Sequence, residues 1–496
     1  MARRDLIGCG RRPPLTIGGG FDMIVEMIDL KLKAAAISLI LFINGALPVF
    51  TANTGSAHNK YRVLENGLRI YLEKRDNIPL ANIVFAINVG SKDESTETSG
   101  MVHLLEHLIL LGETEYHTFT DINLEMRRHG VDFNAHTSHD LMTFEISLPT
   151  QYWEFGLNIL KEKLFHLKFS QQKLAKEKEI IFKEIAQDQD RPLTTGTLLV
   201  LQNLFKNHPY ERPISGDQKV IENTRVEELN RFYKRYFVPS NCSLAVVGDI
   251  DILDIDNKIR QVFGTLEKKE KPPSDFKKTQ PLKKNVKVKE QMDITQSYLI
   301  LGFYAPPSLH PDQLTIGILN RVLGKGIDPL LGRMLVQRRK RLAYTISTRY
   351  IALEYGGAFL IYLTLEPKNI SSARRELIKF FKTSWSFNYS KKDFPLGRRT
   401  HVTDYLETAK NSIKFSHQQF QEQGLNAAIS YAGYILFHKI HQTEGEPYMT
   451  KVEKIKSADL RDAASRYLSG KHYVMVSIRP EKKEKDKKTE GKKIGR

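Results

Sequence analysis

Residues 103–107 (HLLEH) place two histidines and a glutamate at a spacing that suits metal chemistry. On a helix, His103 and His107 lie one turn apart on the same face, so both imidazoles point to one position. Two nitrogens at that spacing suit Zn²⁺, which at a catalytic site takes a third protein ligand and leaves its fourth position to water. Glu106 is expected to take a proton from that water as general base. Because residues 102–109 are mostly apolar, we favour a buried metal site over histidines that are merely hydrogen-bonded in the core.

The third ligand is expected on another helix whose apolar stripe carries acids. Between Leu174 and Ile185, apolar residues recur at spacings of seven and four, and Glu177 and Glu184 fall on this stripe. A carboxylate that faces the core is costly unless it binds a cation or a strong donor. Seven residues span about 10.5 Å of helix, so one of the two would bind the metal and the other would orient a ligand or substrate. The pattern leaves open which does which, and also that Glu177 only pairs with Lys173 on the surface.

The elements that must position these residues alternate between strand-like and helix-like patterns. After a lysine-rich stretch the order strand, helix and closing strand recurs, which predicts two α+β units derived from a duplication. Strands are expected at 81–89, 141–148, 242–247, 297–303 and 473–478, and helices at 100–111, 170–186, 226–236 and 313–322.

Composition and charge exclude several classes of protein. Of the 496 residues, 41% are hydrophobic and 27% are charged, a composition that is ordinary for globular domains. A chain of this length is too long for one hydrophobic core. The net charge is +18, but residues 268–289 carry +7 of it and residues 479–496 carry +5. Such lysine-rich runs are typical of solvated linkers and tails, so a nucleic-acid groove is not indicated. Two cysteines, Cys9 and Cys242, provide neither a disulfide framework nor a thiolate zinc site.

The N-terminus has the pattern of a secretory signal. Lys31 and Lys33 precede an apolar run at 34–43, which is too short for a membrane span of roughly 20 residues. Cleavage is possible after Ala52 or Ala57, so we expect an exported protein, periplasmic in a Gram-negative bacterium, with no stable membrane span after cleavage. The expected organisation is a presequence at 1–57, a zinc-binding domain at 58–266, a lysine-rich linker at 267–290, a homologous domain at 291–480 and a basic tail at 481–496.

Several stretches between residues 62 and 478 resemble the pitrilysin-type zinc metallopeptidases, the family of insulin-degrading enzyme and the mitochondrial processing peptidase. The resemblance implies two homologous α/β-roll domains, each with a mixed or antiparallel sheet and helices packed on one side, in a clamshell arrangement. The matching stretches are NVGSKDE (88–94), SGMVHLLEHLILLGE (99–113), KEIAQD (183–188), HPYERPISGD (208–217), FYKRYFVPSNCSLAVVGDID (232–251) and RLAYTIS (341–347).

The resemblance also implies roles for single residues. His103, His107 and Glu184 match the ligands of one zinc ion, Glu106 matches the general base, and Glu177 matches a further essential acid. The implied reaction is the hydrolysis of peptides or small unfolded polypeptides.

A substrate-binding strand is implied downstream of the motif. Asn134, Ala135 and His136 match the family's edge strand, which pairs with an extended peptide through main-chain hydrogen bonds.

One departure from the family concerns the second half. Members that are complete place an arginine seven residues before a tyrosine, and here Tyr344 is present whereas the earlier position is Gln337. Some members divide the work, so that a zinc-less partner supplies the Arg–Tyr pair. We therefore expect a homodimer or a heterodimer in which this chain bears the zinc. The competing hypothesis is that Arg338, flanked by Arg339 and close to Arg341, takes the role of the missing arginine.

Two other functions remain to be weighed against a peptidase. The same fold serves as a non-catalytic assembly subunit in respiratory complexes, although such relatives usually have decayed zinc motifs and this motif is intact. The lysine-rich linker and tail are also compatible with binding to acidic surfaces such as a membrane or a cell wall.

Overall fold

A computed structural model describes residues 59–270, 273, 276–325, 328–337, 339–383, 404–437 and 448–481. The apolar run at 34–43 and residues 482–496 of the basic tail lie outside the described residues. Within the described ranges, no helix is both long enough and apolar enough to cross a bilayer. Each of the nine strands and helices expected above is present, and its ends differ from the expectation by at most three residues.

Six strands form the first sheet, in the order β1-β2-β8-β3-β6-β5. β2 and β8 are parallel, and all other neighbours are antiparallel. β5 pairs with β6 on one side and leaves its other edge free within this sheet. The strands are β1 (Asn59–Val63), β2 (Arg69–Lys74), β3 (Leu80–Ile87), β5 (Asp132–Thr137), β6 (Met142–Pro149) and β8 (Cys242–Gly248).

The second sheet repeats the topology of the first. Its order is β11-β12-β10-β13-β9, and β9 and β13 are its parallel pair. Counted inward from β5 or from β11, both sheets have three antiparallel pairings followed by one parallel pairing. This repetition agrees with the expected duplication. The strands are β9 (Val286–Met292), β10 (Ser297–Ala305), β11 (Thr345–Ala352), β12 (Gly357–Leu365) and β13 (Tyr473–Pro480).

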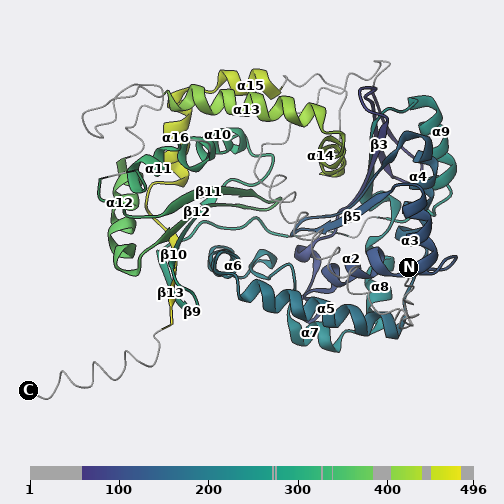
Figure 1. Ribbon diagram of the computed structural model, residues 1–496, viewed down its shortest axis with the longest axis horizontal. Helices are drawn as coiled ribbons and strands as arrows, with labels where there is room; N and C mark the ends of the chain where they lie inside the picture. Colours follow the sequence, from purple (N-terminus) through teal and green to yellow (C-terminus); the bar gives the residue numbers. More distant parts are fainter. Residues whose placement is uncertain are drawn as a thin grey trace, which may run out of the picture. The chain divides into compact units, whose positions relative to one another are not determined.

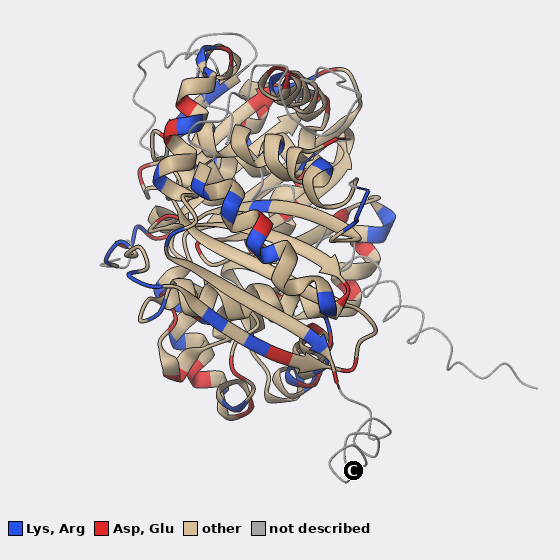
Figure 2. Cartoon of the chain, turned by 90° about the vertical axis from the view of Figure 1, so that its left-hand side faces the viewer, with Lys and Arg blue, Asp and Glu red and all other residues tan. Residues whose placement is uncertain are grey.

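The lysine-rich stretch between the sheets is shorter than the expected linker at 267–290. β9 begins at Val286 because its valines alternate with exposed Lys287 and Lys289, a period-two pattern that lets one side of the strand pack. Upstream, Thr279 is buried and its N–H donates to the carbonyl oxygen of Tyr355. Basic and acidic residues are interspersed over the elements that Figure 2 shows.

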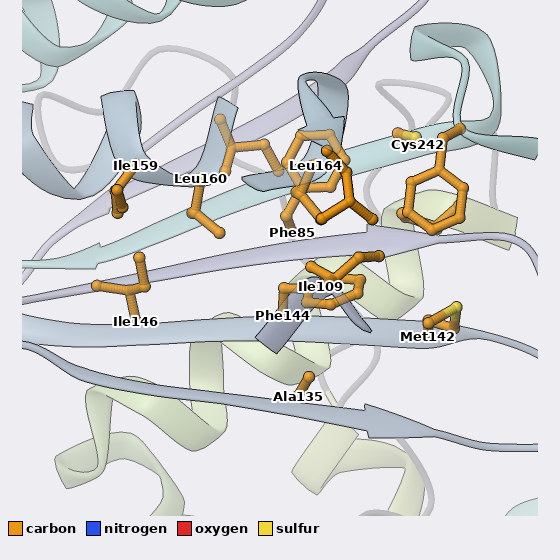
Figure 3. Packing of buried hydrophobic residues seen from close by; sticks show 14 of the residues in the cluster. Phe85, Ile109, Ala135, Met142, Phe144, Ile146, Ile159, Leu160, Leu164 and Cys242 are labelled. Atoms are coloured by element: carbon orange, nitrogen blue, oxygen red, sulfur yellow. The ribbon is translucent and has the colours of Figure 1, made fainter. Parts of the chain in front are cut away.

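One face of the first sheet packs against helices of the first half. Phe85 and Phe144 of the strands lie in one cluster with Leu160 and Leu164 of α4 and Ile109 of α2 (Figure 3). The helices and short strands of this half are α2 (Met101–Leu111), β4 (Glu113–Thr114), α3 (Phe119–Arg128), α4 (Trp153–Phe165), β7 (Leu167–Lys168), α5 (Gln171–Gln189), α6 (Pro192–Leu204), α7 (Gln218–Asn223), α8 (Val226–Tyr236) and α9 (Ile252–Phe263).

The two halves exchange a helix. α6 of the first half packs on β10 and β13 of the second sheet, and α14 of the second half packs on β3 and β8 of the first (Figure 1). The opposite face of each sheet, which the expectation left uncovered, is thus covered by the other half. The helices of the second half are α10 (Gln313–Gly324), α11 (Leu330–Leu335), α12 (Ile370–Thr383), α13 (Tyr405–Glu422), α14 (Gly424–Phe437), α15 (Tyr448–Lys454) and α16 (Ser457–Tyr467).

Candidate metal centre

At each end, helix α2 is hydrogen-bonded to an ionisable side chain from outside the helix. Gly100 precedes it with φ of 96° and has no side chain to cap the helix. The carboxylate of Glu94 takes that role and accepts the N–H groups of Gly100 at 3.0 Å and of Val102 at 2.8 Å. At the other end, Lys163 donates to the carbonyl oxygen of Gly112 at 2.8 Å. Both residues are buried, and burial raises the pKa of Glu94 to about 8 and lowers the pKa of Lys163 to about 7.

Three side chains converge beside this helix. His103 and His107 lie one turn apart on α2, with their ring centroids 4.8 Å apart. Glu184 of α5 brings Oε2 to 3.7 Å from Nε2 of His103 and to 3.5 Å from Nε2 of His107. A tetrahedral zinc site with bonds of about 2.0–2.2 Å requires ligand atoms about 3.3–3.6 Å apart. The two distances from Glu184 are close to this range, and all three ligand atoms lie within 4.8 Å of one another, so the set could hold a metal ion such as zinc.

Glu177 and Glu184 take different positions, which answers the question that the stripe pattern left open. Oε2 of Glu177 lies 3.3 Å from Nδ1 of His107, the ring nitrogen that faces away from Glu184. Its other oxygen lies 2.8 Å from the ammonium of Lys173. The ion pair with Lys173 therefore exists, but Glu177 is only 1% exposed. Glu184 therefore lies beside the Nε2 atoms of both histidines, whereas Glu177 contacts the opposite ring nitrogen of His107.

The protonation states of the two histidines differ. Burial, helped by the adjacent His107, lowers the pKa of His103 to about 4, so this imidazole is neutral and has a free lone pair. Burial also opposes the charged form of His107, but hydrogen bonds to Glu177 and Glu184 outweigh it and raise the pKa to about 10. A metal ion that binds His107 therefore displaces a proton.

Glu106 lies between the two histidines in sequence. It is buried, with 5% of its surface exposed. Burial raises the pKa of Glu106, and the neighbouring His107 opposes this rise. A carboxyl group with a raised pKa is a stronger base than an exposed one, which suits a residue that must take a proton from water near neutral pH.

The predicted substrate-binding residues Asn134, Ala135 and His136 lie in β5, at the free edge of the first sheet. β5 packs against α2, so this edge runs beside the helix of the metal ligands. An edge strand has unpaired main-chain groups that a peptide in extended conformation can bind.

Within the described residues, the side-chain hydrogen bonds of Tyr344 and Gln337 are to acids of the second half. The phenol of Tyr344 is 41% exposed and donates to Glu366 at 3.3 Å, in the same half. The amide of Gln337 donates to Asp328 at 3.2 Å. Arg341 donates to the carbonyl oxygen of Val336, and Arg338 lies outside the described residues.

Sequence reasoning missed the two residues that fix α2. Glu94 lies six residues before Gly100 across a loop, where no helical or strand periodicity can indicate a contact. Lys163 could have been found from the sequence, because it lies on the same face of α4 as the apolar residues and is itself fully buried. A lysine on the buried face of a helix needs acceptors, and here the end of α2 supplies them.

Two family descriptions match the chain. Residues 69–218 match "Insulinase (Peptidase family M16)", and residues 224–399 match "Peptidase M16 inactive domain". The chain is similar to an "Uncharacterized zinc protease" of Rickettsia felis, at 25% identity over 82% of this chain and 94% of that protein. It is also similar to "Zinc protease PqqE" of Helicobacter pylori, at 21% identity over 84% of this chain and 92% of that protein.

Solved structures share the fold. A protease from Helicobacter pylori superposes with a TM-score of 0.75 at 20% identity over 86% of this chain and the whole of that chain. A peptidase M16 inactive domain from Pseudomonas fluorescens gives 0.73 at 17% identity, over 86% of this chain and 98% of that chain. The periplasmic protease PqqL of Escherichia coli gives 0.67 at 17% identity, and there the match spans 86% of this chain but 48% of that chain.

Proposed function

The chain belongs to peptidase family M16, and from this premise we propose that it is a zinc-dependent endopeptidase that hydrolyses peptides or small unfolded polypeptides. The observation that carries the proposal is the ligand set of His103, His107 and Glu184, whose ligand atoms all lie within 4.8 Å of one another. The buried Glu106 beside them supplies a base, and relatives named zinc proteases support the same chemistry.

The residues of the site divide the reaction among them. Zinc, when bound, would polarise the scissile carbonyl group and lower the pKa of a water molecule. Glu106 takes the proton of that water and passes it to the leaving amine. Glu177 accepts the Nδ1 proton of His107 and so keeps Nε2 of this ring directed to the metal. The free edge of β5 holds the peptide extended beside the site.

Replacing Glu106 tests this assignment. In Glu106→Gln the ligands remain, so we expect zinc to stay bound while peptide hydrolysis falls by about 10²–10⁴-fold. Metal analysis and a fluorogenic peptide assay measure the two on one preparation. Glu227→Gln on the exposed side of α8 is the matched control and should change neither. Unchanged hydrolysis by Glu106→Gln would overturn the proposal.

A partner chain completes the proposal. Because the match to the Escherichia coli protease covers 48% of that longer chain, a second chain could supply what this one lacks. We infer that the zinc-bearing chain acts in a dimer. In a homodimer, Tyr344 and its neighbours would bind the substrate, and in a heterodimer a zinc-less partner would supply an Arg–Tyr pair for this. Full activity of a monomer in sedimentation and peptide assays would contradict this. In that case Arg338→Ala, assayed on the same protein, tests whether Arg338 replaces the family arginine.

The alternative is a non-catalytic assembly subunit of the same fold, and one structural relative is titled an inactive domain. The intact ligand set favours the peptidase. Zinc analysis of the purified protein separates the two, because a scaffold without zinc would contain no stoichiometric metal.

We also propose that the protein is exported, and periplasmic in a Gram-negative host, on the basis of the apolar run at 34–43 that follows Lys31 and Lys33. N-terminal sequencing of the mature protein tests this, and a mature chain that begins before Lys31 would contradict it.

A further inference from the structure

A buried carboxylate without a cationic partner lies one strand away from the free edge of the first sheet. We propose that this carboxylate, Glu145 of β6, gives the protein a preference for peptides with a lysine or arginine side chain at the position that lies over His136. The inference rests on the proposed peptidase function and on binding of the substrate along β5.

The strand register sets which side chains share a face. Asn134 of β5 is directly opposite Glu145, and His136 is directly opposite Thr143. Residues directly opposite one another in antiparallel strands project to the same side, so these four side chains form a polar strip on one face. Thr143 donates to Oε1 of Glu145 at 2.9 Å, and Nε2 of His136 lies 3.7 Å from Oε2. The strip therefore runs from the free edge inward to Glu145.

When Glu145 is ionised, no lysine or arginine in the described part of the chain balances its charge. The residue is 4% exposed, and among the described residues no lysine or arginine lies within ion-pair distance of it. Burial lowers the pKa of His136 to about 4, so this ring is neutral near pH 7. Burial, together with the negative charges of Glu106 and Asp132, raises the pKa of Glu145 to about 7. A buried acid with this pKa is only partly ionised near pH 7, and a cation that reaches it stabilises the ionised form.

The geometry of strand addition brings a substrate side chain to this position. A peptide paired with β5 lies about 5 Å from β5 and about 10 Å from β6. Its alternate side chains project to the face of His136, and long side chains reach diagonal neighbours across strands. A lysine or arginine there can pass beside His136 and meet Glu145, whereas a short or acidic side chain cannot pair with it.

A set of peptides that differ at one position tests the proposal. Each position around the scissile bond carries in turn lysine, ε-acetyl-lysine, norleucine or glutamate, and kcat/KM is measured with the zinc-loaded full chain. At one position, or at two positions separated by one residue, we expect lysine to exceed acetyl-lysine by about tenfold or more. In Glu145→Gln the same ratio should fall to about one. The matched control Glu125→Gln removes a charge from α3 and should keep the preference.

The outcomes separate this inference from the function on which it rests. If the wild-type protein cleaves none of the peptides, either alone or after reconstitution with a partner chain isolated with the native protein, the peptidase proposal fails. If it cleaves them with a flat response to lysine at every position, or if Glu145→Gln keeps the preference, the inference alone is overturned. Should Glu145→Gln fail to fold, the comparison of lysine with acetyl-lysine in the wild-type protein still decides, because a flat response rejects the role of a buried acid.

Discussion

Two glutamates on one helix have different partners at the metal centre because the centre lies between them. Glu184 lies near the Nε2 atoms of His103 and His107. Glu177, two turns earlier on α5, contacts Nδ1 on the opposite side of the His107 ring. The ammonium of Lys173 balances the buried charge of Glu177. A histidine ligand whose second nitrogen is bound to a carboxylate is fixed in orientation and is a stronger donor.

Removing the charge of Glu177 should therefore weaken zinc binding without removing a ligand. For Glu177→Gln we expect a loss in zinc affinity of about 10–100-fold, measured by competition with a chromogenic chelator. Glu179→Gln lies on the exposed side of the same helix and serves as control. If the affinity of Glu177→Gln equals that of the control, Glu177 acts on the substrate rather than through His107.

At the scale of elements, α2 depends on side chains that its own sequence does not contain. The helix is apolar and packs into the core, but Gly100 cannot cap its N-terminus. The carboxyl group of Glu94 accepts two of the N–H groups that the start of the helix leaves unpaired. The loop before α2 thus determines whether the histidines are held in place.

We expect Glu94→Ala to lower the free energy of unfolding of the zinc-free protein by about 2–4 kcal/mol, because two buried N–H groups lose their acceptor. Urea denaturation followed by circular dichroism measures the change. Glu97→Ala, three residues on and exposed, should change the stability by less than about 0.5 kcal/mol. Equal stability of the two variants would show that water or another residue caps α2.

At the scale of the whole molecule, the exchanged helices make each half depend on the other. Val200 of α6 packs directly on Gly302 of β10, where a side chain in place of the glycine would lie 2.1 Å from the valine. In the opposite direction, Ser243 of β8 donates to the carbonyl oxygen of Ala432 in α14 at 2.7 Å. The apolar face of each sheet would be exposed without the helix from the other half.

The halves are also joined by buried polar contacts near the end of β5. Asp140, in the turn that follows β5, accepts the hydroxyl of Tyr210 at 2.5 Å and the N–H of Glu354 at 2.9 Å. Lys92, in the loop before α2, donates to the carbonyl oxygen of Asp140 and lies 3.7 Å from the carboxylate of Glu354. The second half therefore supports the loops that position both β5 and α2.

Separate expression of the halves tests this dependence. We expect residues 58–266 alone, and residues 267–496 alone, to aggregate, because the sheet face normally covered by the exchanged helix is exposed. Co-expression should give a soluble complex of both fragments, measured by size-exclusion chromatography. A soluble, monomeric and cooperatively unfolding fragment 58–266 would contradict the prediction and would show that α14 is dispensable to the first sheet.

The sequence by itself determined much of this protein. The spacing of His103 and His107 on an apolar helix indicated a metal site, because four residues bring side chains to one face. The stripe that carries Glu177 and Glu184 indicated the second helix. The order of strands and helices predicted the duplication, because hydrophobic periodicity is local and is written directly in the chain.

Other features were decided by the tertiary structure, because they depend on residues that are far apart in sequence. Periodicity placed both Glu177 and Glu184 on the buried face, but only the position of α2 against α5 separates a ligand from its supporting carboxylate. The cap that Glu94 supplies depends on a loop that no periodic pattern describes. The exchange of α6 and α14 could not be predicted either, since an apolar helix shows in its sequence that it needs a partner surface but not which sheet will provide it.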